Sequence, residues 1–279
     1  MKKTLKQIIL CMAEVYFRDI SIYDESFLKK SILKRMSARS VASPELYLKY
    51  LDNNPSEADT FFDSLTIAYS EFFRNPLTFA IIEVIILPAL LEHMKKISSS
   101  EIRVWSAGCA AGQEAYSVAI LLKELAKSRG ENISFRIFAT DLHERELVSA
   151  RRGIYEAREV QNLRIKHSLA YFSRNGDCYK IAQCLREGID FSVHDLLDEH
   201  SSCPSASIYG NFDLIICSNV LYYYRPEIRR FILEKLRASI SSEGYFVTGE
   251  AERAIVEETK GFRAVAPLLA VFQKIGKGI

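Results

Sequence analysis

The sequence has almost no excess of charge of either sign. Its 279 residues include 37 lysines and arginines and 35 aspartates and glutamates, which leaves a formal net charge of +2. Proteins that bind nucleic acid by neutralising phosphates usually carry a marked basic excess. The near-balance of charge therefore argues against nucleic acid as a partner.

The sequence also lacks the spacings that mark metal sites and disulfide frameworks. Its six cysteines form no CxxC pair, and its five histidines form no HExxH motif. This pattern favours reduced thiols in a cytoplasmic protein, and we expect no bound metal. The cysteines are Cys11, Cys109, Cys178, Cys184, Cys203 and Cys217.

No long hydrophobic run indicates export or a membrane span. The N-terminal stretch begins with lysines but has only about six apolar residues before Glu14, too few for a signal peptide. The apolar run 81–91 contains Glu83 and Pro88 and is shorter than the roughly 20 residues that a membrane helix needs. With 48% hydrophobic residues, the chain can instead bury a large core or a core plus a satellite domain.

The pattern of apolar residues changes near residue 100. Before this point apolar residues recur at helical spacing. Examples are Leu28, Ile32, Leu33 and Met36, and then Phe61, Leu65, Ala68 and Phe72. The turns Ser43-Pro44 and Asn54-Pro55 interrupt this pattern, and the polar segment 97–100 ends it. We predict a helical domain over residues 1–97 and a second domain over residues 98–279.

In the second domain, strands alternate with helices. The expected strands are 101–107, 135–140 and 212–217, and apolar helix faces follow each of them. Such alternation predicts a parallel sheet covered by helices, with 245–249 and 268–275 forming a hairpin-like edge. Residues 155–211 break this rhythm. Their short β-like pieces CYKIA and IDFSV predict a small antiparallel insertion.

Three features fall where the strands of such a sheet end, which is where ligands bind. The first is a turn with Gly108 and Gly112 between the first strand and its helix. Its GxxxG pattern differs from the GxGxxG of dinucleotide sites, and no phosphate-loop lysine follows. Glycine lets a backbone approach a ligand closely, so a nonphosphorylated ligand fits, and a plain packing loop remains the alternative.

The second feature is Asp141, directly after the second strand. A carboxylate at this place can accept hydrogen bonds from both hydroxyls of a ribose, although it could also cap the next helix. The third feature is Asn219, followed by Tyr222, Tyr223 and Tyr224. A polar exit is unusual for a buried strand, but a turn Asn with aromatic side chains at the rim of the core would look the same.

Five segments together resemble the CheR-type chemoreceptor methyltransferases and occur in that family's order. They are Phe72–Pro76, 105–122, 139–155, 191–197 and 212–224. The resemblance implies an α/β fold: a Rossmann-like S-adenosylmethionine-dependent methyltransferase domain, an N-terminal helical domain, and a small antiparallel β subdomain inserted at about 155–192. It also implies S-adenosylmethionine as cofactor, S-adenosylhomocysteine as product, and glutamate side chains of a receptor as acceptor.

The resemblance further implies which residues form the site. The cofactor contacts would be Ser70, Arg74, Gly108, Glu114, Asp141, Asp195, Leu196, Asn219 and Val220. Glu114 would pair with the cofactor's ammonium group, and Arg74 and Tyr223 would lie nearest the chemistry. An acceptor glutamate has a reference pKa of about 4.3 and is ionised at neutral pH, so the reaction needs positioning more than acid or base catalysis.

Some positions depart from the family's pattern. They are Ala68, Gln113, Ala115, Asp195 and Ser218. These departures leave two alternatives open: a catalytically impaired cofactor-binding scaffold, or a methyltransferase for another acceptor. Retention of Arg74, Asp141, Asn219 and Tyr223 favours an active glutamate methyltransferase.

Residues 26–41 carry five basic side chains and no acidic one. They are Lys29, Lys30, Lys34, Arg35 and Arg39. Such a run is often only a solvated helix face, but in the resembling family a basic helix here faces the acidic methylation region of the receptor. We expect the cytoplasmic region of a chemotaxis-type receptor as partner, without membrane insertion, and a monomer. The insertion could bind a tethering peptide by strand addition, which its residues leave open.

Overall fold

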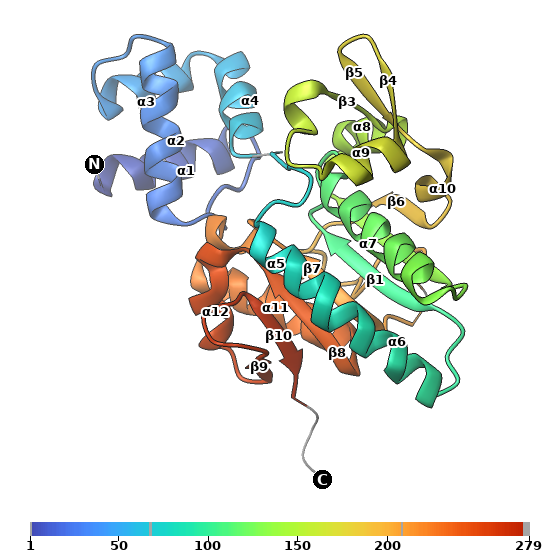
Figure 1. Ribbon diagram of the computed structural model, residues 1–279. Coiled ribbons are helices and arrows are strands. Elements are labelled where there is room, and N and C mark those ends of the chain that lie inside the picture. The colour runs from blue at the N-terminus through green and yellow to red at the C-terminus, as the bar shows by residue number, and fades with distance from the viewer. Residues whose placement is uncertain (1, 67–68, 208, 276–279) are drawn as a thin grey trace. The chain divides into compact units, whose positions relative to one another are not determined.

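The computed structural model describes residues 2–66, 69–207 and 209–275, so Ala68 lies outside the described residues. The chain forms two compact units. The first combines Met1–Ile67 with Tyr222–Arg229, and the second combines Ala68–Leu221 with Arg230–Ile279. The helices and strands carry the labels of Figure 1.

The first unit is helical. Its helices are α1 (Lys2–Glu14), α2 (Glu25–Ala38), α3 (Pro44–Asp52) and α4 (Pro55–Ser64). The side chain of Asp24 accepts hydrogen bonds from the first backbone N–H groups of α2, and Ser43 caps α3 in the same way. Leu28, Ile32 and Met36, one turn apart, form the buried stripe of α2. Leu33 was also expected on this stripe, but it lies off it and is 47% exposed.

Residues 69–97 belong to the second unit, although their helical spacing placed them with the N-terminal helices. They form α5 (Pro76–Ile81), the π-helical turn η1 (Ile82–Ile86) and α6 (Leu87–Lys96). Their apolar side chains, among them Phe79, Ile82 and Leu87, are buried in the core of the sheet. The helical spacing of apolar residues indicates that a helix has an apolar face, but it does not indicate which core that face covers. The helical unit therefore ends near residue 67 rather than at residue 97.

The helical stretch Pro76–Lys96 is long and apolar enough to cross a membrane by length and composition alone. This is weak evidence for a span, because a core helix passes the same test. Ile82, Ile86, Leu90 and Leu91 are all buried, so packing on the sheet accounts for much of the apolar composition.

The centre of the second unit is a seven-stranded sheet in the order β6-β2-β1-β7-β8-β10-β9. The strands are β1 (Ile102–Ala107), β2 (Phe135–Asp141), β6 (Ile189–Val193), β7 (Phe212–Cys217), β8 (Ile240–Thr248), β9 (Phe262–Ala264) and β10 (Val271–Lys274). The first five strands in this order run parallel, and β10 pairs antiparallel with β8 and β9. The predicted parallel sheet with a hairpin-like edge is confirmed.

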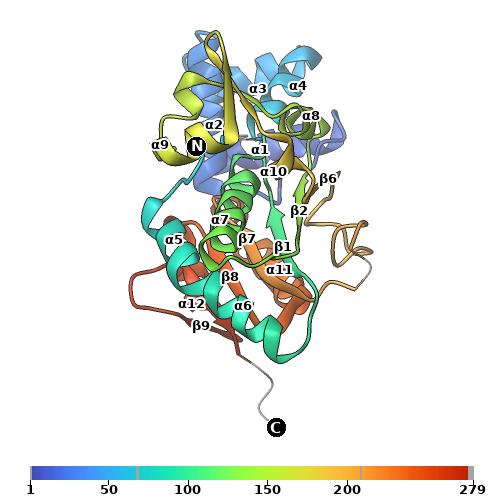
Figure 2. The same cartoon turned by 45° about the vertical axis from the view of Figure 1, so that its right-hand side comes forward.

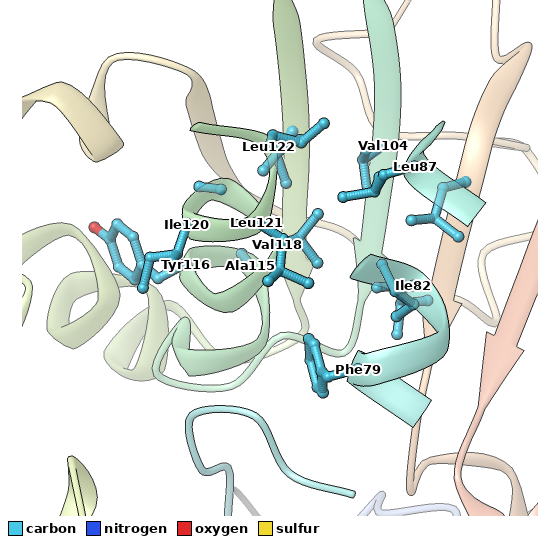
Figure 3. Packing of buried hydrophobic residues seen from close by; sticks show 14 of the residues in the cluster. Phe79, Ile82, Leu87, Val104, Ala115, Tyr116, Val118, Ile120, Leu121 and Leu122 are labelled. Atoms are coloured by element: carbon cyan, nitrogen blue, oxygen red, sulfur yellow. The ribbon is translucent and has the colours of Figure 1, made fainter. Parts of the chain in front are cut away.

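Helices cover both faces of this sheet. Besides α6, they are α7 (Gln113–Arg129), α8 (Glu144–Arg152), α11 (Pro226–Ser239) and α12 (Arg253–Glu257). The helices α6 and α7 lie side by side in both views, on the side facing the viewer in Figure 1, with α11 behind the sheet (Figures 1 and 2). Figure 3 shows Val118 and Leu121 of α7 pointing toward Ile82 and Leu87. Each such side chain contributes roughly 1.5–3 kcal/mol when fully buried.

A second, three-stranded antiparallel sheet is inserted after α8. Its order is β3-β5-β4, with β3 (Ile154–Glu156), β4 (Phe172–Asn175) and β5 (Cys178–Ile181), and it carries η2 (Ala157–Glu159), α9 (Ile165–Tyr171) and α10 (Gln183–Arg186). Gly176, at φ +60°, makes the turn between β4 and β5. The segment CYKIA is confirmed as part of this insertion.

The segment IDFSV was predicted for the same insertion, and this was wrong. It forms β6, which pairs in parallel with β2 from Ile137↔Ile189 to Asp141↔Val193 at the edge of the main sheet. A short apolar strand carries no mark of its partner, so periodicity could not distinguish the two sheets.

Candidate functional site

A pocket lies in the second unit beyond the carboxyl ends of β1 and β7. It encloses about 490 Å³, part of it open to solvent. Five predicted site residues line it: Ser70, Arg74, Gly108, Glu114 and Asn219. They come from the loop before α5, the glycine turn, the first turn of α7 and the exit of β7. The structure thus brings together residues that are about 150 positions apart in sequence, at the edge where parallel sheets bind ligands.

The glycine turn packs too tightly for any other residue at its two glycines. Gly108 and Gly112 have φ values of +82° and +88°, in the left-handed region. A Cβ on Gly108 would lie 2.7 Å from Cγ2 of Val220, and one on Gly112 would lie 2.9 Å from Cβ of Ala150. Val220, another predicted site residue, is therefore placed directly against the turn.

Glu114 presents a carboxylate at the wall of this pocket. Burial raises its pKa to about 7, although the hydroxyl of Ser106 and the nearby charge of Arg74 act in the opposite direction. The Ser106 hydroxyl donates to Oε1 of Glu114 over 2.6 Å. A carboxylate held in this way is stabilised in its charged form when a cation enters the pocket, so Glu114 can bind an ammonium group.

Arg74 reaches the pocket from a loop with unusual backbone angles. Its neighbours Phe73 and Asn75 have φ values of 51° and 60°, which are costly for residues other than glycine. The backbone N–H of Phe73 donates to Oγ of Ser117 over 3.0 Å, which helps to hold this conformation. The guanidinium of Arg74 donates to the carbonyl of Tyr69 over 3.1 Å and stacks on its ring. The loop is therefore built to present Arg74 in one orientation.

The inserted subdomain packs against this same loop. The ring of Phe72 lies edge-on to Tyr155 and Phe172, with centroids 4.9 Å and 5.4 Å away. The ring of Phe73 stacks on the buried His167 of α9 at 5.4 Å. The subdomain therefore supports the segment that carries Arg74.

Asp141 connects the end of β2 to the glycine turn. One carboxylate oxygen accepts the N–H of Ala110 over 2.9 Å, and the other accepts the N–H of His143 over 3.0 Å. The residue that caps α8 is His143, so Asp141 is not the helix cap. Asp141 does not line the pocket, and its binding of a ribose stays a prediction.

Asp195, Leu196 and Tyr223 also lie outside the pocket lining. Asp195 is exposed in the segment after β6 and accepts the N–H of Leu197 over 2.8 Å. Leu196 is buried at 9% exposure. Tyr223 belongs to the first unit. Roles near the adenine and the acceptor stay predictions for these residues.

Asn219 has a buried side-chain donor at the pocket. Its φ of +64° places it in the left-handed region at the exit of β7. Its side-chain nitrogen Nδ2 is buried and has no hydrogen-bond acceptor among the described residues. Leaving such a group unpaired costs about 1–3 kcal/mol. A buried donor on a pocket wall fits a polar ligand that accepts from it.

Glu252 holds the segment that follows β7 by hydrogen bonds, and it was not among the predicted site residues. This carboxylate in η4 (Glu250–Glu252) is fully buried. It accepts the N–H of Asn219 over 2.8 Å, the N–H of Leu221 over 2.6 Å and the hydroxyl of Thr248 over 2.7 Å. The sequence reads Gly-Glu-Ala-Glu here, and nothing in it distinguishes Glu252 from Glu250 before the turn is seen.

Among the described residues, no cluster of three or more His, Cys, Asp or Glu side chains could hold a metal ion. The functional groups that line the pocket are two carboxylates, Glu71 and Glu114, one guanidinium, amides and hydroxyls. Such groups recognise a ligand by charge and hydrogen bonds. They suit a small zwitterionic molecule more than a polyphosphate.

Comparisons with known proteins show the family to which the chain is similar. The family described as "CheR methyltransferase, SAM binding domain" matches residues 68–267, and "CheR methyltransferase, all-alpha domain" matches residues 5–66. The chemotaxis protein methyltransferase of Listeria innocua is 31% identical over 237 residues, which is 85% of each chain. That of Borreliella burgdorferi is 30% identical over 74% of this chain and 72% of its own. That of Escherichia coli is 28% identical over 87% of this chain and 86% of its own.

Proposed function

This chain belongs to the CheR methyltransferase family of S-adenosylmethionine-dependent enzymes, and we propose that it methylates glutamate side chains in the cytoplasmic region of a chemotaxis-type receptor. The observation that carries this proposal is the meeting of Ser70, Arg74, Glu114 and Asn219 at one pocket. These residue types match the groups of an amino-acid-bearing cofactor and a carboxylate acceptor.

The pocket residues fit the cofactor's methionine end. Glu114 would hold the ammonium group, and the unpaired Nδ2 of Asn219 would donate to a polar group beside it. Gly108 and Val220 would form the floor on which that end rests, because no side chain projects from Gly108.

The residues outside the pocket lining would hold the cofactor's nucleoside. A carboxylate has about four acceptor sites, so Asp141 could accept ribose hydroxyls beside the two backbone N–H groups that it already holds. Asp195 and Leu196 would lie near the adenine.

The proposed reaction requires little from the protein beyond orienting the methyl donor and the acceptor carboxylate. S-adenosylmethionine, when bound, supplies a methyl group on a positively charged sulfur. The acceptor carboxylate, with a reference pKa of about 4.3, is already ionised and needs no base. Arg74 and Tyr223 would orient it, which removes much of the entropic barrier. Because charge is lost as the ester forms, a tight ion pair with Arg74 would stabilise the ground state more and slow the reaction.

The basic residues of α2 do not all serve the same purpose. Arg35 makes two hydrogen bonds of 2.8 Å and 2.7 Å to the buried carboxylate of Glu57, and Arg39 makes one of 2.6 Å. The hydroxyl of Tyr47 donates to the same carboxylate over 3.0 Å. Arg35 and Arg39 therefore help to hold the helical unit together, and the docking role expected for the five basic residues stays a prediction.

Two lysines remain as candidates for receptor docking. Lys29 pairs with Glu25 over 3.3 Å, whereas Lys30 and Lys34 are exposed. They are four residues apart, so they project from the same side of α2. We propose that Lys30 and Lys34 attract an acidic face of the receptor in the cytoplasm.

The test is incubation with tritiated S-adenosylmethionine and receptor-containing membranes. Label that is lost in mild base, on bands of receptor size, would support glutamate methylation, and the Arg74→Ala variant should give none. Binding of cofactor without any transfer would instead favour the scaffold alternative. Base-stable label, or label on other molecules, would favour another acceptor.

A further inference from the structure

Tyr223 is held by the helical unit through backbone hydrogen bonds. The N–H of Asp24 donates to the carbonyl of Tyr223 over 2.8 Å, and the N–H of Arg225 donates to the carbonyl of Ile22 over 3.0 Å. Tyr23 and Tyr224 form an antiparallel β-bridge between these two bonds. The segment that follows the exit of β7 is thus paired with the residues that lead into α2.

Aromatic rings extend this contact to the side chain of Tyr223. The ring of Phe27, in the first turn of α2, lies 4.8 Å from that of Tyr223 at a tilt of 59°. Tyr23 stacks on Tyr224 at 5.5 Å and 12°. The hydroxyls of Tyr222 and Tyr223 are 2.6 Å apart. The ring of Tyr222 lies 4.1 Å from that of Tyr223, so Tyr223 packs between its neighbour in the chain and a ring from α2.

Charged groups also join the segment of Tyr222 and Tyr223 to the start of α2. Nη2 of Arg229 donates to the carbonyl of Tyr222 over 3.2 Å and lies 3.5 Å from Oδ2 of Asp24. The other oxygen of Asp24 caps α2 by accepting the N–H of Ser26 over 2.8 Å. A movement of the start of α2 would therefore be passed to the Tyr222–Tyr223 backbone.

We propose that Phe27 is a positioning residue for Tyr223, so that the helix that docks the acceptor also sets the orientation of a catalytic side chain. The proposal rests on the proposed function, which gives Tyr223 its catalytic role. Phe27, Lys30 and Lys34 are spaced three and four residues apart, so they follow one face of α2. Receptor docking at the lysines would thus act on the helix that holds Tyr223.

The first experiment compares Phe27→Leu with Phe62→Leu. Phe62 is a matched control, because it is also a half-buried phenylalanine packed on the core of the helical unit, and its ring lies under Arg18. We expect Phe27→Leu to lower kcat at least about tenfold, where kcat is calculated on the concentration of protein that binds cofactor. The Kd for S-adenosylhomocysteine should stay unchanged. Phe62→Leu should leave kcat unchanged, and Phe27→Tyr, which keeps the ring, should restore it.

A double-mutant cycle separates positioning from packing. If Phe27 acts through Tyr223, the effect of Phe27→Leu on kcat should largely disappear in a Tyr223→Phe background. An equal fall in kcat in both backgrounds, or an equal fall with Phe62→Leu, would mean that Phe27 only packs the unit, and the inference would be wrong.

A spectroscopic measurement keeps this inference distinct from the proposed function. In protein labelled on tyrosine rings, the NMR signal of Tyr223 should shift or broaden in Phe27→Leu and stay unchanged in Phe62→Leu. If the wild-type chain methylates no receptor, the proposed function fails, yet the Tyr223 signal still reports whether Phe27 orders this ring. An unchanged Tyr223 signal in Phe27→Leu would overturn the inference even in an active enzyme.

Discussion

Glu252 accepts a hydrogen bond from the backbone N–H of Asn219 over 2.8 Å, and this bond shapes the turn that brings Asn219 to the pocket. We predict that Glu252→Gln weakens S-adenosylhomocysteine binding about tenfold and destabilises the fold. An amide cannot accept several N–H groups as a carboxylate does, and hydrogen bonds to a charged group contribute about 1.5–3 kcal/mol each. Calorimetry and thermal unfolding measure the two effects.

The matched control for Glu252 is Glu250→Gln. Glu250 lies in the same short helix, two residues away, but is exposed. The Glu250→Gln substitution should leave both the dissociation constant for S-adenosylhomocysteine and Tm unchanged. Equal effects of the two substitutions would mean that loss of negative charge, rather than loss of the turn, explains the result.

The raised pKa of Glu114 predicts opposite effects of Glu114→Gln on stability and on binding. Burial raises the pKa in the folded state to about 7, from 4.5 in the unfolded chain. The stability that this shift contributes is present below about pH 4.5 and is lost as the pH rises through about 7. At pH 8 the folded apoprotein therefore carries an unfavourable buried charge. Glu114→Gln should raise the free energy of unfolding at pH 8 by on the order of 1–3 kcal/mol.

The same substitution should abolish tight cofactor binding, because an amide cannot balance an ammonium group. For the wild-type chain, affinity should fall as the pH drops below about 7, where Glu114 becomes protonated before ligand binds. Thermal unfolding at pH 6 and pH 8, with calorimetry at both, tests these statements. A Glu114→Gln variant that is less stable at pH 8, or that binds the ligand normally, would contradict them.

Features that depend on neighbours along the chain could be predicted from the sequence. The alternation after residue 101 predicted the parallel sheet, because period and length distinguish buried strands from amphipathic helices. Gly108 and Gly112 marked the turn, since only glycine fits there. The predicted residues Ser70, Arg74, Glu114 and Asn219 do meet at one pocket, but the family resemblance, not their spacing, selected them.

Features that depend on distant partners were not predictable in the same way. The pairing of IDFSV with β2, and the packing of α5 and α6 on the sheet, are decided by surfaces that a local pattern does not reveal. The basic run of α2 is acid-free in sequence, yet Glu57 from α4 neutralises two of its arginines. Glu252 has its role because it accepts a hydrogen bond from Leu221, which lies 31 residues away in sequence.

The division of the basic run predicts two different mutant phenotypes. Reversing Lys30 and Lys34 to Glu should slow receptor methylation at low salt and leave Tm and cofactor affinity unchanged. Added salt should reduce the wild-type rate as well, because exposed charges are screened beyond a Debye length of about 8 Å at physiological ionic strength.

Substitution at Arg35 should instead destabilise the helical unit. Arg35→Ala leaves the fully buried Glu57 with one fewer partner, and breaking a buried pair from one side costs about 3–5 kcal/mol. Thermal unfolding and salt-dependent methylation assays on both variants separate recognition from folding. If the Lys30 and Lys34 reversal leaves the low-salt rate unchanged, receptor docking must lie elsewhere on the chain.

Ser117 should determine the position of Arg74 without itself contacting a ligand. Its hydroxyl accepts the N–H of Phe73 over 3.0 Å and donates to the carbonyl of Gln113 over 2.7 Å, which fixes the left-handed residue before Arg74. Ser117→Ala would leave a buried N–H unpaired, at a cost of about 1–3 kcal/mol, unless the loop shifts. We therefore predict a lower kcat/KM, by roughly tenfold or more, because a small displacement of an orienting side chain is costly for transfer.

The same helix offers the control for this prediction. Ser128 also donates its hydroxyl to a carbonyl of α7, that of Leu125 over 2.9 Å, but it is exposed and near the C-terminal end of the helix. Ser128→Ala should leave kcat/KM at the wild-type value. An effect of Ser117→Ala no larger than that of Ser128→Ala would show that the Arg74 loop keeps its conformation without this hydrogen bond.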